Sequence, residues 1–321
     1  MLLFLAVSFA VSAQSKREVV RAKVDSVLLK NYNKSNFDTL YMKRPEGKLT
    51  LKLRGNLSGN YLKSRYTVSG ERVTAKLNTD TRATLSVAAT YLGVTAGVAI
   101  NPARLSGRNK DVEFNVNAYG NRFGIEANYQ LSRTLSGDIN YGTEHDHIEK
   151  GYLRLANVAI SGYYAFNYKH FSYPAAFTQS YIQKRSAGSW LAGFSYSGGS
   201  IKTTDEVPGD VPDMRFYVGS FAIGGGYGYN LVAGKWLFHL SAQPNIIVFK
   251  TNNVKIDGVK YKESFRFPES IINNRAAIVY NFNQKYFAGT TFISNLSLFG
   301  DKDEYTRQMK WLSRVFVGIR L

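Results

Sequence analysis

Two histidines beside carboxylates are the first residues of this sequence whose types and spacing could support chemistry. His145 and His147 stand two positions apart in a run that also contains Asp146 and Glu149. Imidazole nitrogens and carboxylate oxygens are ligands of divalent cations such as zinc. No third histidine lies nearby in the sequence, and two histidines in a polar loop more often mark a solvated turn. His145 and His147 are therefore candidates only, and we expect neither a bound metal nor a cofactor.

A second pairing, His239 with Ser241, could supply a general base and a nucleophile. A serine activated by a histidine is the core of many hydrolase sites, including those of lipid-modifying membrane enzymes. The neighbours Leu237 and Gln243 supply no acid to orient the imidazole. A histidine that is hydrogen-bonded to a neighbouring strand is the other interpretation. The sequence therefore favours a protein without enzymatic activity and leaves a lipid-modifying enzyme open.

Basic side chains at every second position form the third chemical feature. Residues that alternate in this way share one face of a strand. The basic set consists of Lys52, Arg54, Arg82, Arg275, Lys310 and Arg314, and a smaller acidic set consists of Asp111, Glu113 and Glu126. If both sets face a common lumen, they form a basic wall and an acidic wall. Such walls could attract and bind anions, or they could be salt-bridged filler inside a plugged barrel.

Strands with one apolar face are the elements that must position these walls. From Lys48 onward the period is two, with Leu49, Leu51 and Leu53 alternating with polar residues, and the pattern recurs along the rest of the chain. It gives about twelve strands. Lipid offers no hydrogen bonds to an open sheet edge, so such strands must close on themselves. The sequence predicts an all-β fold, a closed antiparallel transmembrane outer-membrane β-barrel.

Connection lengths agree with this fold, because outer-membrane barrels alternate short periplasmic turns with longer outer loops. Asn283-Gln284 predicts a short turn, whereas Ser58 to Thr81 and Ser132 to Gly151 are expected to be outer loops. Residues 169–189 break the rule, since the segment is long yet falls on the periplasmic side. It could fold back as an inner plug, dock a periplasmic protein, or merely lengthen two strands.

Three regions are expected along the chain. Residues 1–13 are apolar and end in Val11-Ser12-Ala13, the spacing typical of a signal peptide. Residues 14–47 are expected to form a periplasmic lead-in with a short helix, and residues 48–321 to form the barrel. The sequence contains no cysteine, so disulfides cannot hold the fold in an oxidising compartment.

The formal net charge of +18 bears on partners. An exported protein does not meet nucleic acid, so we expect no nucleic-acid partner. The anions of the envelope are outer-membrane lipids, lipopolysaccharide and small anionic solutes, and these are the expected partners at the cell outer membrane. A periplasmic protein that contacts residues 169–189 is a further expected partner.

Two stretches of the sequence carry a family resemblance. One is Asn36-Phe37-Asp38-Thr39-Leu40-Tyr41 with Arg44-Pro45, and the other is Phe171 to Phe177 followed by Gln183 to Ser189. Through these stretches, nearly the whole mature chain resembles an uncharacterised Bacteroidota family of predicted outer-membrane barrels, a domain of unknown function. The resemblance implies a barrel in a Gram-negative envelope and implies no catalytic or binding residue.

The sequence as a whole predicts a porin-like barrel that passes or binds small polar or anionic solutes. The main alternative is a structural or assembly protein of the envelope that docks a periplasmic partner.

Overall fold

The computed structural model describes most of the chain beyond residue 35. The described residues are 36–321, apart from 69, 93, 103–110, 206, 208–212, 257, 262–267 and 301–303, together with 26, 29 and 30. Contacts divide the chain into two units, Met1–Phe37 and Asp38–Leu321. The expected signal peptide and most of the expected lead-in helix lie outside the described residues. Within the described ranges, no helix is long and apolar enough to cross a bilayer.

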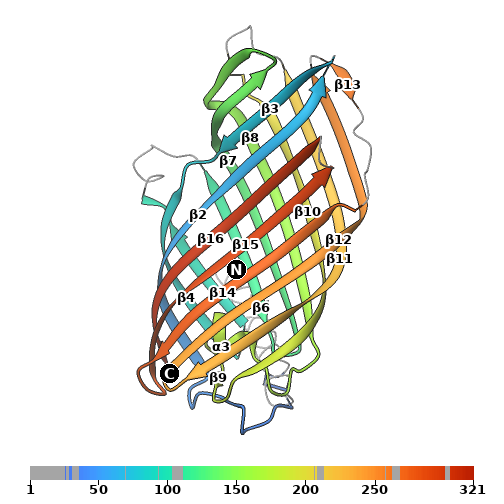
Figure 1. Cartoon of the computed structure of the whole chain (residues 1–321). Helices are drawn as coiled ribbons and strands as arrows, with labels where there is room; N and C mark the ends of the chain where they lie inside the picture. Colours follow the sequence, from blue (N-terminus) through green and yellow to red (C-terminus); the bar gives the residue numbers. More distant parts are fainter. Residues whose placement is uncertain are drawn as a thin grey trace, which may run out of the picture. The chain divides into compact units, whose positions relative to one another are not determined.

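Long, tilted antiparallel strands make up most of the second unit (Figure 1). The strands that form the wall are β2 (Leu49–Val68), β3 (Glu71–Asn78), β4 (Arg82–Tyr91), β5 (Val94–Ile100), β6 (Val112–Tyr119), β7 (Phe123–Tyr141), β8 (Glu144–Ala165), β10 (Ala187–Thr203), β11 (Met214–Ala233), β12 (Trp236–Ile256), β13 (Val259–Tyr261), β14 (Ser270–Asn281), β15 (Tyr286–Gly300) and β16 (Tyr305–Arg320). A further pair, β1 (Met42–Lys43) and β9 (Ile182–Gln183), forms a separate two-stranded sheet.

The wall closes into a ring in which every member has two hydrogen-bonded neighbours. In order, the ring is β2-β4-β5-β6-β7-β8-β10-β11-β12-β14-β15-β16, and β16 pairs again with β2. These twelve described strands coincide with the strands that the alternation predicts. The predicted all-β, closed antiparallel barrel is therefore confirmed.

The barrel is narrower at one end because β3 takes the place of three strands. β3 pairs on one side with residues 61–68 of β2 and on the other with residues 136–141 of β7, so β4, β5 and β6 are bypassed there. The ring through β3 has ten described strands. The expected loops Ser58 to Thr81 and Ser132 to Gly151 are largely strands, so those two loop predictions are wrong. Their apolar residues explain why: Leu77, Leu135 and Ile148 are buried with Leu153 and Leu155 in one cluster.

Apolar side chains face outward and polar side chains face inward along the wall. On β11, Tyr227, Tyr229 and Leu231 are 44%, 42% and 48% exposed, whereas Ser220 and Asn230 are buried. This inside-out arrangement is that of a barrel whose outer surface contacts lipid and whose lumen is polar.

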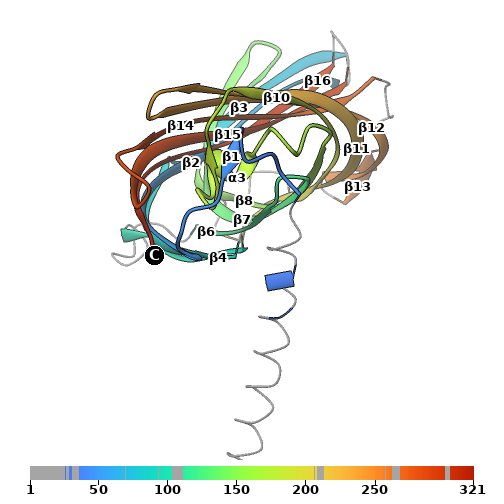
Figure 2. The ribbon, with the colours of Figure 1, turned by 90° about the horizontal axis from the view of Figure 1, so that it is seen from below.

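A plug fills the lumen at the end opposite to β3. We define the plug as residues 166–186, which include the short helix α3 (Tyr173–Phe177) and β9. Figure 2 shows α3 and β1 inside the ring of strands. Ser172 caps the helix by accepting a hydrogen bond from the backbone of Ala175 (3.2 Å), and Pro174 occupies its first turn. All five residues of α3 are buried, so of the three interpretations of residues 169–189 the inner plug is the one that the structure shows.

One glycine of β11 makes room for this plug. Gly228 faces inward, and a Cβ atom there would lie 3.0 Å from the ring of Phe171 in the plug. A larger residue would therefore push the plug away from the wall.

Candidate functional site

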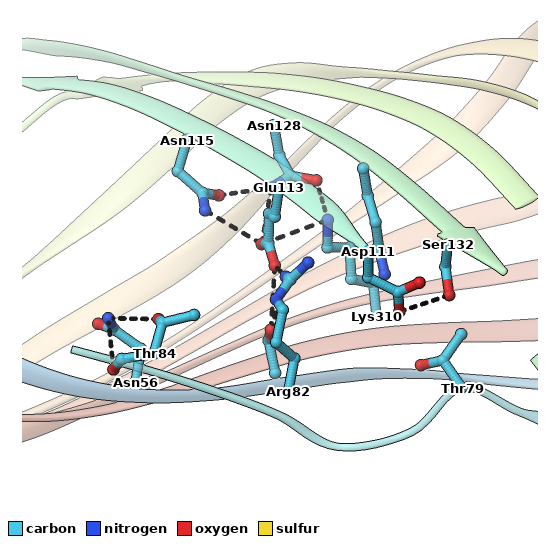
Figure 3. Close-up of polar contacts among 12 residues, drawn as sticks. Asn56, Thr79, Arg82, Thr84, Asp111, Glu113, Asn115, Asn128, Ser132 and Lys310 are labelled. Carbon is cyan, nitrogen blue, oxygen red and sulfur yellow. Dashed lines mark hydrogen bonds and ion pairs between the residues drawn. The ribbon is translucent and has the colours of Figure 1, made fainter. Parts of the chain in front are cut away.

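The side chains of the predicted walls all face the lumen, and most of them pair with each other. Arg82 on β4 and Lys310 on β16 both form ion pairs with Glu113 on β6, the latter at 3.6 Å (Figure 3). Lys310 also donates to Asn128, and Asn128 donates to Glu113 Oε1 (3.0 Å), the oxygen that pairs with Lys310. The single negative charge of Glu113 thus offsets part of the positive charge of two cations in the middle of the lumen.

A second ion pair lies deeper, towards the plug. Arg275 on β14 donates to Glu126 on β7 at 2.9 Å and to Ser161 on β8 at 3.1 Å. The side chain of Arg275 is 3% exposed. This pair crosses the lumen, because β14 and β7 are not neighbours in the ring.

Asp111 accepts several hydrogen bonds from β7, and its charge also acts on Arg82. Its carboxylate accepts hydrogen bonds from the hydroxyls of Ser132 (2.7 Å) and Thr134 (2.9 Å) and from the backbone of Arg133 (2.9 Å). Ser132 and Thr134 lie where β7 changes partner from β6 to β3. Asp111 therefore holds the branch point of the sheet.

Arg54 on β2 and Arg314 on β16 differ from the other cations of the wall, because neither guanidinium has an acceptor among the residues that the structure describes. Arg54 lies opposite Phe316, and Arg314 lies opposite Asn56, so the two arginines occupy diagonal positions on paired strands. Diagonal neighbours are close enough for long side chains to meet. The Nε atom of Arg54 is buried without a hydrogen-bond partner. We call this pair of arginines the Arg54–Arg314 site.

The strands beside this site, β5 and β6, contact each other at few of the described residues. Gly97 on β5 faces Arg54, and a Cβ atom there would come 2.9 Å from the guanidinium. Across the described residues, β5 and β6 share the single pair Val94 and Ala118. Asn115 on β6 is exposed although it bonds to Glu113 in the lumen. The sheet beside the Arg54–Arg314 site is therefore held by few described backbone contacts between β5 and β6.

Two further cations of the same wall donate hydrogen bonds to the plug. Lys52 donates to the carbonyl oxygens of Phe177 and Thr178, both at 3.2 Å, and to the side-chain oxygen of Gln179 at 3.0 Å. Arg320 donates to the carbonyl oxygen of Gln179 at 3.1 Å. Lys52, which the sequence places in the basic wall, is thus a plug contact, and Arg320 is a second one.

His239 and Ser241 take part in a buried chain of hydrogen bonds. The imidazole contacts Ser241 Oγ at 3.0 Å through Nε2 and Asn230 Oδ1 at 2.7 Å through Nδ1. Sequence reasoning missed Asn230, which lies on the neighbouring strand and is revealed only by the register of β11 and β12. The order serine, histidine, asparagine is that of a nucleophile, a base and an orienting group.

The plug nevertheless covers this chain. The hydroxyl of Tyr173 donates to Ser241 Oγ at 2.8 Å, and the rings of Phe171, Tyr173 and Phe177 pack around His239. Burial raises the pKa of Tyr173, so its hydroxyl stays protonated and donates. The amide of Asn230 in turn donates to the carbonyl oxygen of Ser172 at 2.9 Å. The geometry supports an anchor for the plug, because the Tyr173 hydroxyl and the three rings take the positions beside Ser241 and His239.

The two candidate metal ligands lie on the exposed part of β8. His147 contacts Asp138 at 2.8 Å, and His145 contacts Asn140 at 2.5 Å. Within the part of the chain that the structure describes, no group of three or more histidine or carboxylate side chains could hold a metal ion.

Several solved structures resemble this chain in fold, although they share little sequence. The outer membrane protease OmpT from Escherichia coli matches 86% of this chain and 97% of its own, with a TM-score of 0.46 and 8% identity. The translocator domain of the autotransporter NalP from Neisseria meningitidis covers 95% and 98%, with a TM-score of 0.33 and 10% identity. An outer membrane channel from Pseudomonas putida F1 covers 85% and 97%, with a TM-score of 0.31 and 13% identity.

Sequence comparison gives the family directly. No curated protein sequence matches the chain. Residues 36–320 match the family described as "Domain of unknown function (DUF4421)". Both stretches that carry the resemblance, including the plug, lie inside the matched range. This chain therefore belongs to the DUF4421 family, and its own fold is a closed antiparallel β-barrel.

Proposed function

We propose that this protein is an outer-membrane barrel that binds a small anionic solute in its lumen at the Arg54–Arg314 site. The observation that carries the proposal is the contrast between the cations of one wall. Arg82, Arg275 and Lys310 have carboxylate partners, whereas Arg54 and Arg314 have none among the described residues.

Two unpaired guanidinium groups inside a barrel are costly. Each loses part of its hydration, and the two positive charges repel each other. A carboxylate or a phosphate from a solute would relieve both costs, because a guanidinium offers donors in a fork that matches such groups. The arrangement therefore suits an anion with two or more oxygens.

The plugged lumen favours binding of a solute over its free passage through the barrel. The plug closes one end through Lys52, Arg320 and the anchor at Asn230. Passage through the barrel would require the plug to move. The second candidate function, docking of a periplasmic protein, would have to use the exposed side chains of the plug end, among them Lys184 and Arg185.

Titration of the refolded full chain with inorganic phosphate tests the anion site. We expect the double variant R54M/R314M to lose at least about tenfold in affinity, because both charge-assisted contacts are removed. R307M is the matched control, since Arg307 is an exposed residue of the same strand, β16. Equal phosphate affinity in the double variant and the wild type would refute the site.

A further inference from the structure

A row of cations crosses four neighbouring strands on the outer surface of the barrel. Arg154 on β8 lies opposite Lys202 on β10, Lys202 lies opposite Arg215 on β11, and Arg215 lies opposite Lys255 on β12. Neighbouring strands are about 4.8 Å apart, so the four residues span roughly 14 Å. We call them the outer cation row.

Alternation along each strand shows that the row faces outward. Arg215 shares its face of β11 with Tyr217, which is 41% exposed, and Lys202 shares its face of β10 with Tyr196, which is 40% exposed. On β8, the neighbours of Arg154 are Leu153 and Leu155, which point inward and are buried. The row is therefore not part of the lumen.

The protein itself neutralises little of this charge. Like charges on directly opposite residues of a sheet destabilise it. Arg215 forms an exposed ion pair with Asp213 at 3.0 Å, and the ammonium group of Lys202 lies 4.9 Å from the centre of the Tyr217 ring. Among the residues that the structure describes, Arg154 and Lys255 contact no carboxylate. Asp205 also acts electrostatically on Arg215, so both nearby carboxylates serve one of the four cations. The other three favour an anion from outside the chain.

The height of the row on the barrel matches the edge of a membrane. Trp190, which is 69% exposed, lies near the plug end of β10, about twelve residues before Lys202. At a rise of about 3.3 Å per residue and a tilt of about 40°, this separation corresponds to roughly 30 Å along the barrel axis. The apolar band of an outer-membrane barrel is about 25 Å tall. If Trp190 marks one interface, the outer cation row lies at the headgroups of the other.

A hollow in the outer wall lies directly on the membrane side of the row. Its volume is about 470 Å³. Its lining includes Tyr129, Tyr196, Gly198, Tyr217, Gly219 and Thr251. Of its outward-facing residues, Gly198, Ser200, Tyr217, Gly219, Thr251 and Asn253 stand two or four positions from the row along their strands, and Tyr196 stands six.

We propose that the outer cation row and this hollow bind a phosphorylated lipid of the outer leaflet. The headgroup phosphates contact Arg154, Lys202, Arg215 and Lys255, and an acyl chain of the same molecule occupies the hollow. A soluble anion would use the charge alone, whereas a lipid uses both the charge and the hollow at the depth where they occur. This site is separate from the Arg54–Arg314 site, which lies in the lumen.

Binding of lipid A to the refolded full chain in detergent tests this proposal. The probe is lipid A with its phosphates, compared with the same lipid after chemical dephosphorylation. We expect the phosphorylated lipid to bind at least about tenfold more tightly, and R154Q/K202Q/K255Q to remove that difference. The control K48Q/K235Q/K285Q removes three charges at exposed positions outside the row and should leave the difference unchanged. Equal affinity for the two lipids, or an unchanged triple variant, would overturn the proposal.

A second variant tests the hollow. T251F places a large apolar side chain at an exposed, outward position, where it should not disturb folding. We expect it to weaken binding of acylated lipid A several-fold and to leave binding of the deacylated, phosphorylated headgroup unchanged. Loss of affinity for both probes, or for neither, would show that the hollow does not hold part of the lipid. Heat-modifiable migration on gels confirms that each variant is folded.

Discussion

Glu113 is the residue on which the middle of the lumen depends. Its two oxygens serve Arg82, Lys310, Ser58 and Asn128, and its side chain is 6% exposed. A carboxylate in this position lowers the cost of burying two cations, even where the ion pairs add little net stability of their own.

Replacing Glu113 by glutamine should therefore destabilise the barrel more than its small change in shape suggests. The amide keeps one acceptor but leaves Arg82 and Lys310 without a countercharge, and we expect a loss of about 3 kcal/mol in the free energy of unfolding. Urea unfolding in detergent, followed by loss of heat-modifiable migration, measures it. E144Q, an exposed glutamate at the start of β8, is the matched control. If E113Q lowers the free energy of unfolding no more than the control does, the charge of Glu113 does not stabilise the two buried cations.

The alternation of residues predicts which side chains face the lumen but not which of them meet. A period of two assigns Lys52, Arg54, Arg275 and Glu126 to one face of their strands without any knowledge of the fold. The pair of Arg275 with Glu126 depends on how strands that are not neighbours lie across the lumen. For the same reason the sequence could not show which cations have a carboxylate partner and that Arg54 and Arg314 differ from them. The proposed anion site depends on this difference between the cations, and only the structure shows it.

Among the elements, the plug and β3 differ most from a simple barrel. Twelve strands could be recognised because each has a regular apolar face towards lipid. β3 is short, and its residues alternate less clearly; only Leu77 is buried. The plug has no period at all, and its position follows from its hydrogen bonds to Lys52, Arg320 and Asn230. Both segments lack a lipid-facing pattern. The sequence therefore predicted a loop where β3 lies and gave three interpretations for the plug segment.

Lys52 provides the test of the plug as an element. K52M removes the donor to Phe177, Thr178 and Gln179 while keeping the length of the side chain. We expect a weaker hold on α3 and a measurable increase in conductance in planar bilayers over that of the wild type. K48M, a change of the same kind at an exposed position just before β2, should leave the conductance unchanged. Equal conductance of K52M and the wild type would show that the plug does not depend on this lysine.

At the scale of the whole molecule, the barrel has two different ends and two different charged surfaces. The lumen contains the Arg54–Arg314 site above a plugged end, and the outer wall contains the outer cation row towards the narrower end. The lipid proposal requires the plug to face the periplasm and the β7–β8 hairpin to face the outside. An even number of strands is consistent with this orientation, because the chain then enters and leaves the barrel at the same end.

Cysteine labelling on intact cells tests that orientation. The sequence contains no cysteine, so a single introduced thiol has no background. Thr143 lies in the exposed turn between β7 and β8, at the far end from the plug, and T143C should react with a membrane-impermeant maleimide. Gln284 lies in the turn between β14 and β15, where its carbonyl accepts from Arg320 at 3.1 Å beside the plug, and Q284C should react only after the outer membrane is permeabilised. The reverse pattern would place the plug at the cell surface, and it would move the outer cation row to the inner leaflet.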